Sequence, residues 1–193
     1  MNRKFRIYLN APITLGFAFL CLIALLLQYL TGYHSTNLFF STYASSFANP
    51  LTYVRLVGHV FGHANFEHLM SNMMYILLLG PVLEEKYHDK LIYVILVTAV
   101  ITGLTNNILC PNIQLMGASG VVFAFILLAS VTGHQDGIPI TLILVALLWI
   151  GGEVSSAIHA KDTISQMAHI IGGGAGGIMG MAFKGRRSSH HFR

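Results

Sequence analysis

Four long segments of the 193-residue chain contain no Asp, Glu, Lys or Arg, and they constrain the fold more than any other feature of the sequence. They cover residues 7–54, 91–135, 137–152 and 163–183. Only 9% of all residues are charged, against about 25% in soluble domains. So few charges cannot cover the surface of a water-exposed globule of this size. The apolar excess therefore predicts a protein that faces lipid.

The uncharged segments are long enough to cross a bilayer, which takes about 20 apolar residues as a helix. Inside lipid every backbone polar group must be paired within the protein, which favours helices. The sequence therefore predicts an all-α membrane protein with a core at 11–183, between a tail at 1–10 and a basic tail at 184–193. The core divides into six predicted spans: 11–33, 66–83, 90–109, 118–133, 138–155 and 165–183.

The basic residues are distributed unevenly over the predicted loops, and this sets the orientation. With six spans and a cytoplasmic N-terminus, only Arg55 and Lys161 lie outside. The others lie inside, in keeping with the bias of Lys and Arg toward cytoplasmic loops: Arg3, Lys4, Arg6, Lys86, Lys90, Lys184, Arg186, Arg187 and Arg193. Both termini are therefore predicted to be cytoplasmic. Because these charges flank the ends of spans, the net charge of +4 does not indicate nucleic-acid binding.

The longest predicted connection, 34–65, lies outside and carries many aromatic residues. Part of it is expected to rest in the membrane interface, where aromatic rings are enriched: Phe39, Phe40, Tyr43, Phe47 and Tyr53. The first span has basic residues before it, as a signal peptide does. Its apolar stretch is longer than that of a signal peptide and no convincing cleavage site follows, so we expect a retained anchor.

Polar side chains inside the predicted spans are candidates for function, because such residues are costly in lipid. His68 and Asn72 are four residues apart in the second span and share one helix face. Ser119 opens the fourth span and His169 lies near the start of the sixth. Even-numbered spans all run from outside to inside in this topology. These four residues are therefore predicted at a similar depth, in the outer half of the membrane.

The residue types at this depth suit acyl transfer. A serine hydroxyl becomes a good nucleophile when a histidine takes its proton, which assigns Ser119 as nucleophile and His169 as base. The oxyanion that forms needs donors, for which the backbone N–H of Ser119 and the side chains of His68 and Asn72 are candidates. Glu153 and Asp162 are the only acids near the outer side of the last two spans, and neither has an obvious spacing. The prediction is therefore a Ser-His dyad.

Glycines around these residues indicate close helix packing. Gly172, Gly176 and Gly180 form consecutive small-xxx-small steps in the sixth span, which let another helix approach closely. Gly117 and Gly120 flank Ser119 in the same way. Close backbones are what a short Ser-His hydrogen bond requires.

A metal site is the alternative for the outer histidines. His59, His63 and His68 form a cluster that could hold zinc, which would make the chain a non-catalytic membrane binder or a metal transporter. No carboxylate or cysteine completes the cluster, and the HExxH signature is absent. Each glycine or histidine above also has a structural interpretation, as a packing residue or as a member of an interhelical hydrogen bond. The two functions predict different outcomes with a serine-directed probe.

The order of these motifs resembles the rhomboid family of intramembrane serine proteases. That family has His-x-x-x-Asn in its second core helix, Gly-x-Ser-Gly opening the fourth, and Ala-His-x-x-Gly-x-x-x-Gly in the sixth. The matching residues here are His68 and Asn72, then Gly117, Ser119 and Gly120, then Ala168, His169, Gly172 and Gly176. His59 and His63 are similar to the His-rich approach to the second helix, and Glu84 to the acidic residue that ends it.

The resemblance implies a bundle of six transmembrane helices around a water-filled cavity that is open to the outside. It implies an endopeptidase that cleaves peptide bonds in or near the transmembrane segments of single-span membrane proteins, with Ser119 as nucleophile and His169 as base. His68, Asn72 and the Ser119 backbone would bind the oxyanion, and no metal or cofactor would be needed. A six-span core of this kind is expected in a bacterial inner membrane, with the lipid bilayer and membrane-protein substrates as its partners and no nucleic acid.

The sequence departs from the family pattern at two places. Many relatives have a tyrosine four residues after the serine, where this chain has Phe123, so the ring is retained without its hydroxyl. Many also carry Trp-Arg in the first outer loop, where this chain has Val54 and Arg55. The substrate gate is expected at the fifth span, which has Gly151 and Gly152 near its outer end, or in the loop that follows it. Substrate identity and oligomeric state are not predicted by any of these motifs.

Overall fold

The computed structural model describes residues 8–131 and 163–184, together with positions 140, 143, 144, 147, 148 and 151. The described residues form helices and connecting segments, with one isolated β-bridge and no strand among them. The helices are α1 (Pro12–Leu30), α2 (His34–Phe39), α3 (Pro50–Gly58), α4 (Phe66–Tyr87), α5 (Lys90–Leu109), α6 (Ser119–Val131) and α8 (Thr163–Lys184). The predicted all-α fold class is confirmed.

Three of these helices are long and apolar enough to cross a membrane, namely α1, α4 and α5. α6 and the segment His169–Phe183 of α8 are shorter apolar helices. Most of the predicted fifth span at 138–155 lies outside the described residues, so the count of six spans stays a prediction. The same holds for the tails, because residues 1–7 and 185–193 also lie outside the described part.

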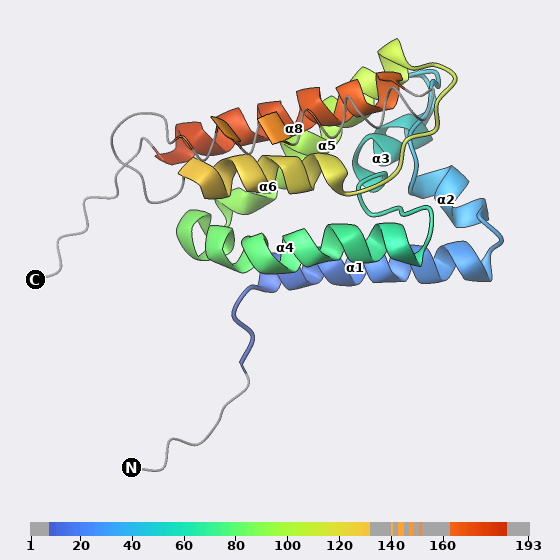
Figure 1. Cartoon of the computed structure of the whole chain (residues 1–193). Helices are drawn as coiled ribbons and strands as arrows, with labels where there is room; N and C mark the ends of the chain where they lie inside the picture. Colours follow the sequence, from blue (N-terminus) through green and yellow to red (C-terminus); the bar gives the residue numbers. More distant parts are fainter. Residues whose placement is uncertain are drawn as a thin grey trace, which may run out of the picture.

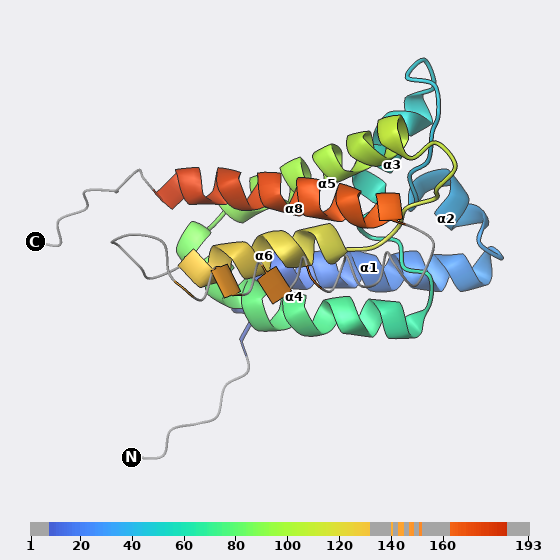
Figure 2. The same ribbon diagram turned by 45° about the horizontal axis from the view of Figure 1, so that its top comes forward.

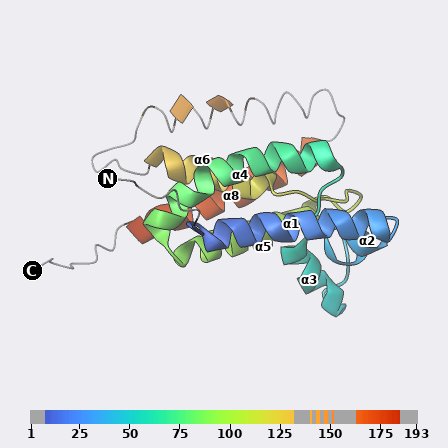
Figure 3. The ribbon, with the colours of Figure 1, turned by 90° about the horizontal axis from the view of Figure 1, so that it is seen from below.

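The long helices lie roughly alongside one another (Figure 1). α1 packs against α4, while α8 packs against both α5 and α6. The view in Figure 2 shows α8 beside α5 and α6, and Figure 3 shows α1 and α4 from below. α4, α6 and α8 all begin at the end of the bundle where α2 and α3 lie (Figure 1). This is the shared start that the predicted topology requires of the even-numbered spans.

α6 is largely enclosed by its neighbours. Most of its side chains are buried, whereas Ile126, Ala129 and Ser130 are half-buried. The buried ones are Val121, Val122, Phe123, Ala124, Phe125, Leu127, Leu128 and Val131. A helix with so few polar residues is stable inside a bundle or in lipid. The enclosure fixes the axis of α6 and therefore the position of Ser119, its first residue.

A carboxylate joins α1 to α4 at the opposite end of the bundle. Glu84 of α4 accepts hydrogen bonds from the backbone N–H groups of Ile13 and Thr14 and from the Thr14 hydroxyl, each at 2.8 Å. Ala11, which precedes α1, has no side chain that could cap the helix. The first-turn N–H groups of α1 would otherwise lack acceptors, and an anion also interacts favourably with a helix N-terminus. Glu84 therefore caps a helix other than its own.

The outer connection contains two short helices, α2 and α3, that the sequence analysis did not predict. Arg55 of α3 anchors the preceding loop, because its Nε donates to the Leu38 carbonyl at 3.2 Å and its guanidinium lies over the Tyr43 ring. Arg55 is only 4% exposed. The neighbouring Val54, where relatives have Trp, is largely exposed. The loop is thus held by Arg55 and Tyr43 without the tryptophan.

Candidate active site

Ser119 and His169 meet near the starts of α6 and α8. The Ser119 hydroxyl and His169 Nε2 are 3.1 Å apart, within hydrogen-bonding distance. Both residues are half-buried. Ser119 is the first residue of α6, and His169 lies in the second turn of α8. The structure therefore brings together the two side chains that the sequence pairs as nucleophile and base.

The turn before Ser119 depends on glycine. Gly117 has a φ of 139°, a backbone conformation that side chains rarely adopt. A Cβ added there would lie 2.9 Å from His68 Cε1, 3.0 Å from His68 Nε2 and 3.8 Å from the Ser119 hydroxyl. The Gly117 N–H donates to the His59 carbonyl at 2.9 Å. Gly117 thus lets the His68 ring and the Ser119 hydroxyl face one small space.

His68 is oriented by the residues around the start of α4. Its ring meets the His63 ring edge-on, with the centroids 5.1 Å apart. Nδ1 faces the backbone N–H of Ala64 at 3.5 Å, an arrangement in which Nδ1 accepts and the proton of a neutral ring is on Nε2. Nε2 is the ring atom next to Gly117. It is therefore a donor aimed at the space beside Ser119, where an oxyanion would need one.

Asn72 lies one turn further along α4 and is only 6% exposed. Its Nδ2 donates to the His68 carbonyl at 2.9 Å. A side-chain amide has two N–H groups, so this bond uses one and leaves a second. Asn72 therefore fixes the backbone of His68 as well as offering a donor of its own.

The predicted packing glycines lie where α8 meets its neighbours. A Cβ at Gly172 would overlap the Thr102 hydroxyl, and one at Gly176 would overlap the Thr98 hydroxyl. Gly120 faces the same two threonines, with an added Cβ 3.1 Å from the Thr102 Oγ1. Together these glycines and threonines form a seam between α5, α6 and α8, which we call the glycine seam. It lies directly beneath Ser119 and His169.

α5 also contributes polar residues to this site, which were not predicted from the sequence. Thr98, Thr102 and Asn106 are spaced four residues apart on one face of the helix and are at most 2% exposed. Asn106 Nδ2 donates to the carbonyls of Thr42, at 3.2 Å, and Ile113, at 3.1 Å. Polar residues at this spacing in an otherwise apolar span were a signal that could have found them.

Two loops are joined just before the nucleophile. Thr42 and Leu115 form an isolated antiparallel bridge, with N–H to O distances of 2.9 and 2.8 Å. Gln114 Nε2 donates to Asn37 Oδ1 and to the Ser41 hydroxyl, each at 2.7 Å. The outer loop is therefore tied to the segment that leads into Ser119.

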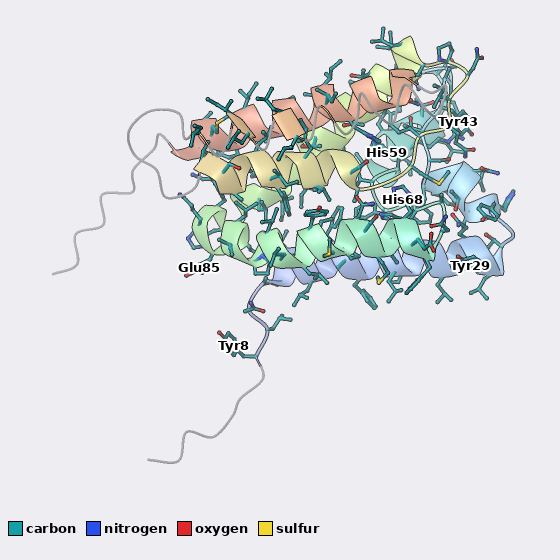
Figure 4. The ribbon with its side chains drawn as sticks, in the orientation of Figure 1. Tyr8, Tyr29, Tyr43, His59, His68 and Glu85 are labelled. Atoms are coloured by element: carbon teal, nitrogen blue, oxygen red, sulfur yellow. The ribbon has the colours of Figure 1, made fainter. Side chains whose placement is uncertain are left out.

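The other two outer histidines make structural contacts. His59 Nε2 donates to the Ala99 carbonyl at 3.0 Å, and His63 Nδ1 to the Phe61 carbonyl at 3.1 Å. Burial lowers the pKa of both imidazoles to about 4, so they are neutral at pH 7. Figure 4 shows His59 and His68 near the start of α6, far from Glu85. Among residues 8–131 and 163–184, no three His, Cys, Asp or Glu side chains are placed to hold a metal ion.

Several predicted positions lie outside the described residues. Glu153 and Asp162 are among them, and so is Gly152 of the expected gate. Phe123, which replaces the tyrosine of many relatives, is 3% exposed and packs against Gly173. An added Cβ at Gly173 would lie 2.6 Å from the Phe123 ring, so the ring and α8 are in close contact.

Comparison with known proteins identifies the family. A family model described as the Rhomboid domain matches residues 50–186, which is most of the chain and includes α3 to α8. The chain belongs to the rhomboid family. With its apolar helices, this makes it an integral membrane protein built as a helical bundle.

Named relatives include rhomboid proteases and rhomboid-related proteins. Rhomboid-related protein 1 of Caenorhabditis elegans is 33% identical over 140 residues, 67% of this chain and 38% of that protein. Rhomboid-related protein 2 of Mus musculus is 27% identical over 154 residues, 68% of this chain and 51% of that protein. Rhomboid protease GlpG of Yersinia pseudotuberculosis is 28% identical over 168 residues, 79% of this chain and 59% of that protein. The chain therefore spans about half the length of the curated relatives it matches.

Proposed function

We propose that this rhomboid is an intramembrane serine endopeptidase that uses a Ser119–His169 dyad. Its substrates are single-span membrane proteins, cut in or near their transmembrane segments. The observation that carries the proposal is the 3.1 Å separation of the Ser119 hydroxyl and His169 Nε2. The names of the GlpG relatives, which are rhomboid proteases, support the same reaction class.

The dyad would act in two steps. His169 Nε2 takes the Ser119 proton as the hydroxyl oxygen attacks the scissile carbonyl carbon, and then gives that proton to the leaving amine. The peptide C–N bond breaks and an ester to Ser119 remains. A water molecule, deprotonated by His169, then attacks the ester, which releases the acid and restores the hydroxyl.

The oxyanion of each tetrahedral intermediate would lie in the space beside Gly117. The Ser119 backbone N–H is a candidate donor, because the first N–H groups of a helix have no carbonyl partner within it. His68 Nε2 and the second N–H of Asn72 are the side-chain donors. Donors that are fixed before the reaction stabilise the developing charge without reorganising, and losing one typically costs about 10²–10³-fold in kcat.

We propose that both termini lie in the cytoplasm, because the basic residues at 1–10 and 184–193 are then inside. The bacterial organisms of the GlpG relatives support a bacterial inner membrane. The core at 11–183 carries the active site, which opens to the outside. The reaction as written uses only side-chain and backbone groups of the chain, with no metal or cofactor.

Two variants test the proposal in purified, lipid-reconstituted protein. Ser119→Ala and His169→Ala are expected to lower cleavage of a single-span substrate at least about 10³-fold, while the thermal midpoint stays near the wild-type value. Ser130→Ala is a matched control, because Ser130 lies on the same helix and bonds only the Ile126 carbonyl at 2.8 Å among described groups. A fluorophosphonate should label wild-type protein and Ser130→Ala but not Ser119→Ala. Cleavage or labelling that persists in Ser119→Ala would overturn the proposal.

A further inference from the structure

Thr102 lies between the two helices that carry the dyad. It belongs to α5, which contributes no member of the dyad. Its hydroxyl oxygen faces Gly120, the residue after Ser119, where an added Cβ would lie 3.1 Å away. The same oxygen faces Gly172, three residues after His169, where an added Cβ would overlap it. One side-chain atom thus touches both catalytic helices within a turn of the reacting groups.

The contact leaves no room for a larger group. Thr102 is 2% exposed, and a Cβ at Gly172 would also lie 2.8 Å from the Thr102 Cβ and 2.9 Å from its backbone nitrogen. Close-packed interiors relax only partly when a group grows, so neighbouring backbones must shift. A methyl group is larger than a hydroxyl oxygen. Placing one at the position of the Thr102 oxygen would therefore push α8 away from α5.

A threonine hydroxyl in a helix usually donates a hydrogen bond to a backbone carbonyl. The Thr102 hydroxyl instead faces glycines of the neighbouring helices. No hydrogen-bond partner for this buried oxygen is found among the described residues. Thr98 repeats the arrangement one turn earlier, where its hydroxyl faces Gly176. Contacts of Cα–H groups with oxygen recur at close helix interfaces. The two threonines thus present their oxygen atoms to the glycine backbones of α8.

We propose that Thr102 is a positioning residue for the dyad. Its hydroxyl oxygen is the spacer that sets α6 and α8 at the separation at which Ser119 and His169 meet at 3.1 Å. The catalytic consequence rests on the proposed protease function, whereas the spacing itself does not. Because reacting groups must be held closely, a shift of about 1 Å at such a site can cost about 10²-fold in rate.

Two substitutions separate the oxygen from the methyl group of Thr102. Thr102→Val replaces the oxygen by a methyl group, and we expect kcat for a single-span substrate to fall about tenfold or more, with KM within about twofold of wild type. Thr102→Ser keeps the oxygen and removes the methyl group, so kcat should stay within about threefold of wild type. A retained kcat in Thr102→Val, or an equal loss in Thr102→Ser, would overturn the proposal.

A matched control distinguishes positioning from a general loss of stability. Thr105→Val makes the same change three residues further along α5, at a position that is only half-buried. We expect Thr105→Val to keep wild-type kcat, and the thermal midpoint of Thr102→Val to lie within a few degrees of that of Thr105→Val. If kcat falls equally in both variants, Thr102 has no positioning role. The same conclusion holds if the loss of kcat in Thr102→Val is explained by a large drop in its thermal midpoint.

A structural measurement does not depend on activity. Structures of wild-type, Thr102→Val and Thr102→Ser protein in lipid should show the distance between Ser119 Oγ and His169 Nε2. We expect it to lengthen beyond the hydrogen-bonding range in Thr102→Val and to remain near 3.1 Å in Thr102→Ser. An unchanged distance in Thr102→Val would overturn the spacer role. Wild-type protein that neither cleaves nor reacts with a fluorophosphonate would instead overturn the proposed function, while the distances still test the spacer.

Discussion

Two helix junctions in the described part of the bundle are held by different means. In the glycine seam, Gly120, Gly172 and Gly176 face the hydroxyls of Thr98 and Thr102. At the other end of the bundle, the Glu84 carboxylate accepts three hydrogen bonds from the first turn of α1. The seam is a steric contact. The α1–α4 junction also has a close glycine contact, of Gly80 with Thr14, but adds charge-assisted hydrogen bonds to it.

The difference shows how geometry and stability are separated in this molecule. The position of a steric contact is set by atomic radii, so it fixes the distance between two helices without any directional bond. A buried carboxylate with three donors contributes free energy of folding, because each donor would otherwise lack a partner. The seam lies beside Ser119 and His169, and the carboxylate lies far from them. Changes in the seam should therefore affect activity first, and changes at Glu84 should affect stability first.

The largest effect is expected from a side chain placed in the seam. Gly172→Val should lower the rate of fluorophosphonate labelling more than about 100-fold, because the new side chain must displace Thr102 and move the turn that carries His169. Gly174→Val is the matched control, since an added Cβ there meets no atom of the described residues within 4 Å. Labelling by both variants is measured at equal protein concentration. Equal rates for Gly172→Val and wild type would contradict the comparison.

A smaller effect, on stability, is expected at the α1–α4 junction. Glu84→Ala removes the acceptor of three hydrogen bonds and should lower the free energy of unfolding by about 2–4 kcal/mol. The measurement is unfolding by a denaturing detergent, followed by circular dichroism. Below the unfolding transition, the labelling rate per folded molecule should remain within about threefold of wild type.

Glu85→Ala is the control for that experiment, because Glu85 is the next residue on α4 and is exposed. It should change the free energy of unfolding by less than about 0.5 kcal/mol. If Glu84→Ala lowered labelling per folded molecule as strongly as Gly172→Val does, the separation of geometry from stability would be wrong.

The smallest effect is a pH dependence of stability from the outer histidines. Burial lowers the pKa of His59 and His63 from 6.5 to about 4, so between these values the unfolded chain binds more protons than the folded one. The contribution of each neutral histidine to the free energy of unfolding is therefore fully present above pH 6.5. It falls as the pH drops toward 4, by at most about 1.4 kcal/mol per pH unit for each histidine. Detergent unfolding between pH 7.5 and 4 measures it.

Replacing one histidine should flatten this profile. His59→Gln keeps an N–H donor for the Ala99 carbonyl but cannot titrate, so the fall in stability should be shallower than in wild type. His88→Gln is the control, because His88 is exposed. A profile that His59→Gln leaves as steep as that of wild type would show that this imidazole is not the titrating group.

The common depth of Ser119 and His169 could be anticipated from the charge distribution, and their approach from the glycines near them. The uncharged segments predict the spans, the basic residues predict their direction, and the direction places Ser119 and His169 at one depth. The structure agrees in that α4, α6 and α8 begin at the same end (Figure 1). The all-α class followed from the same segments, because a span in lipid has few alternatives to a helix.

The seam and the outer loop could not be anticipated in the same way. The role of Thr102 depends on its contact with Gly172, which is far away in the sequence and is brought next to it by the tertiary fold. The start of α3 did carry a local signal that was not used, because Pro50 opens the helix and the Asn49 side chain accepts from the Leu51 N–H. Glu84 was matched to a family position, but its role as a cap for α1 depends on how two helices end beside each other. Such contacts between distant segments carry no local pattern.

The bridge between Thr42 and Leu115 has a practical consequence for anyone who engineers this chain. Because the pairing fixes which residue of one segment faces which residue of the other, inserting or deleting a single residue between Phe40 and Thr42 would shift the alignment and turn neighbouring side chains to the opposite face. Leu115 lies two residues before Gly117, so the pairing is close to the turn that carries Ser119. An epitope inserted in this loop should therefore go near Ala48, beyond the paired residues, where the loop is exposed.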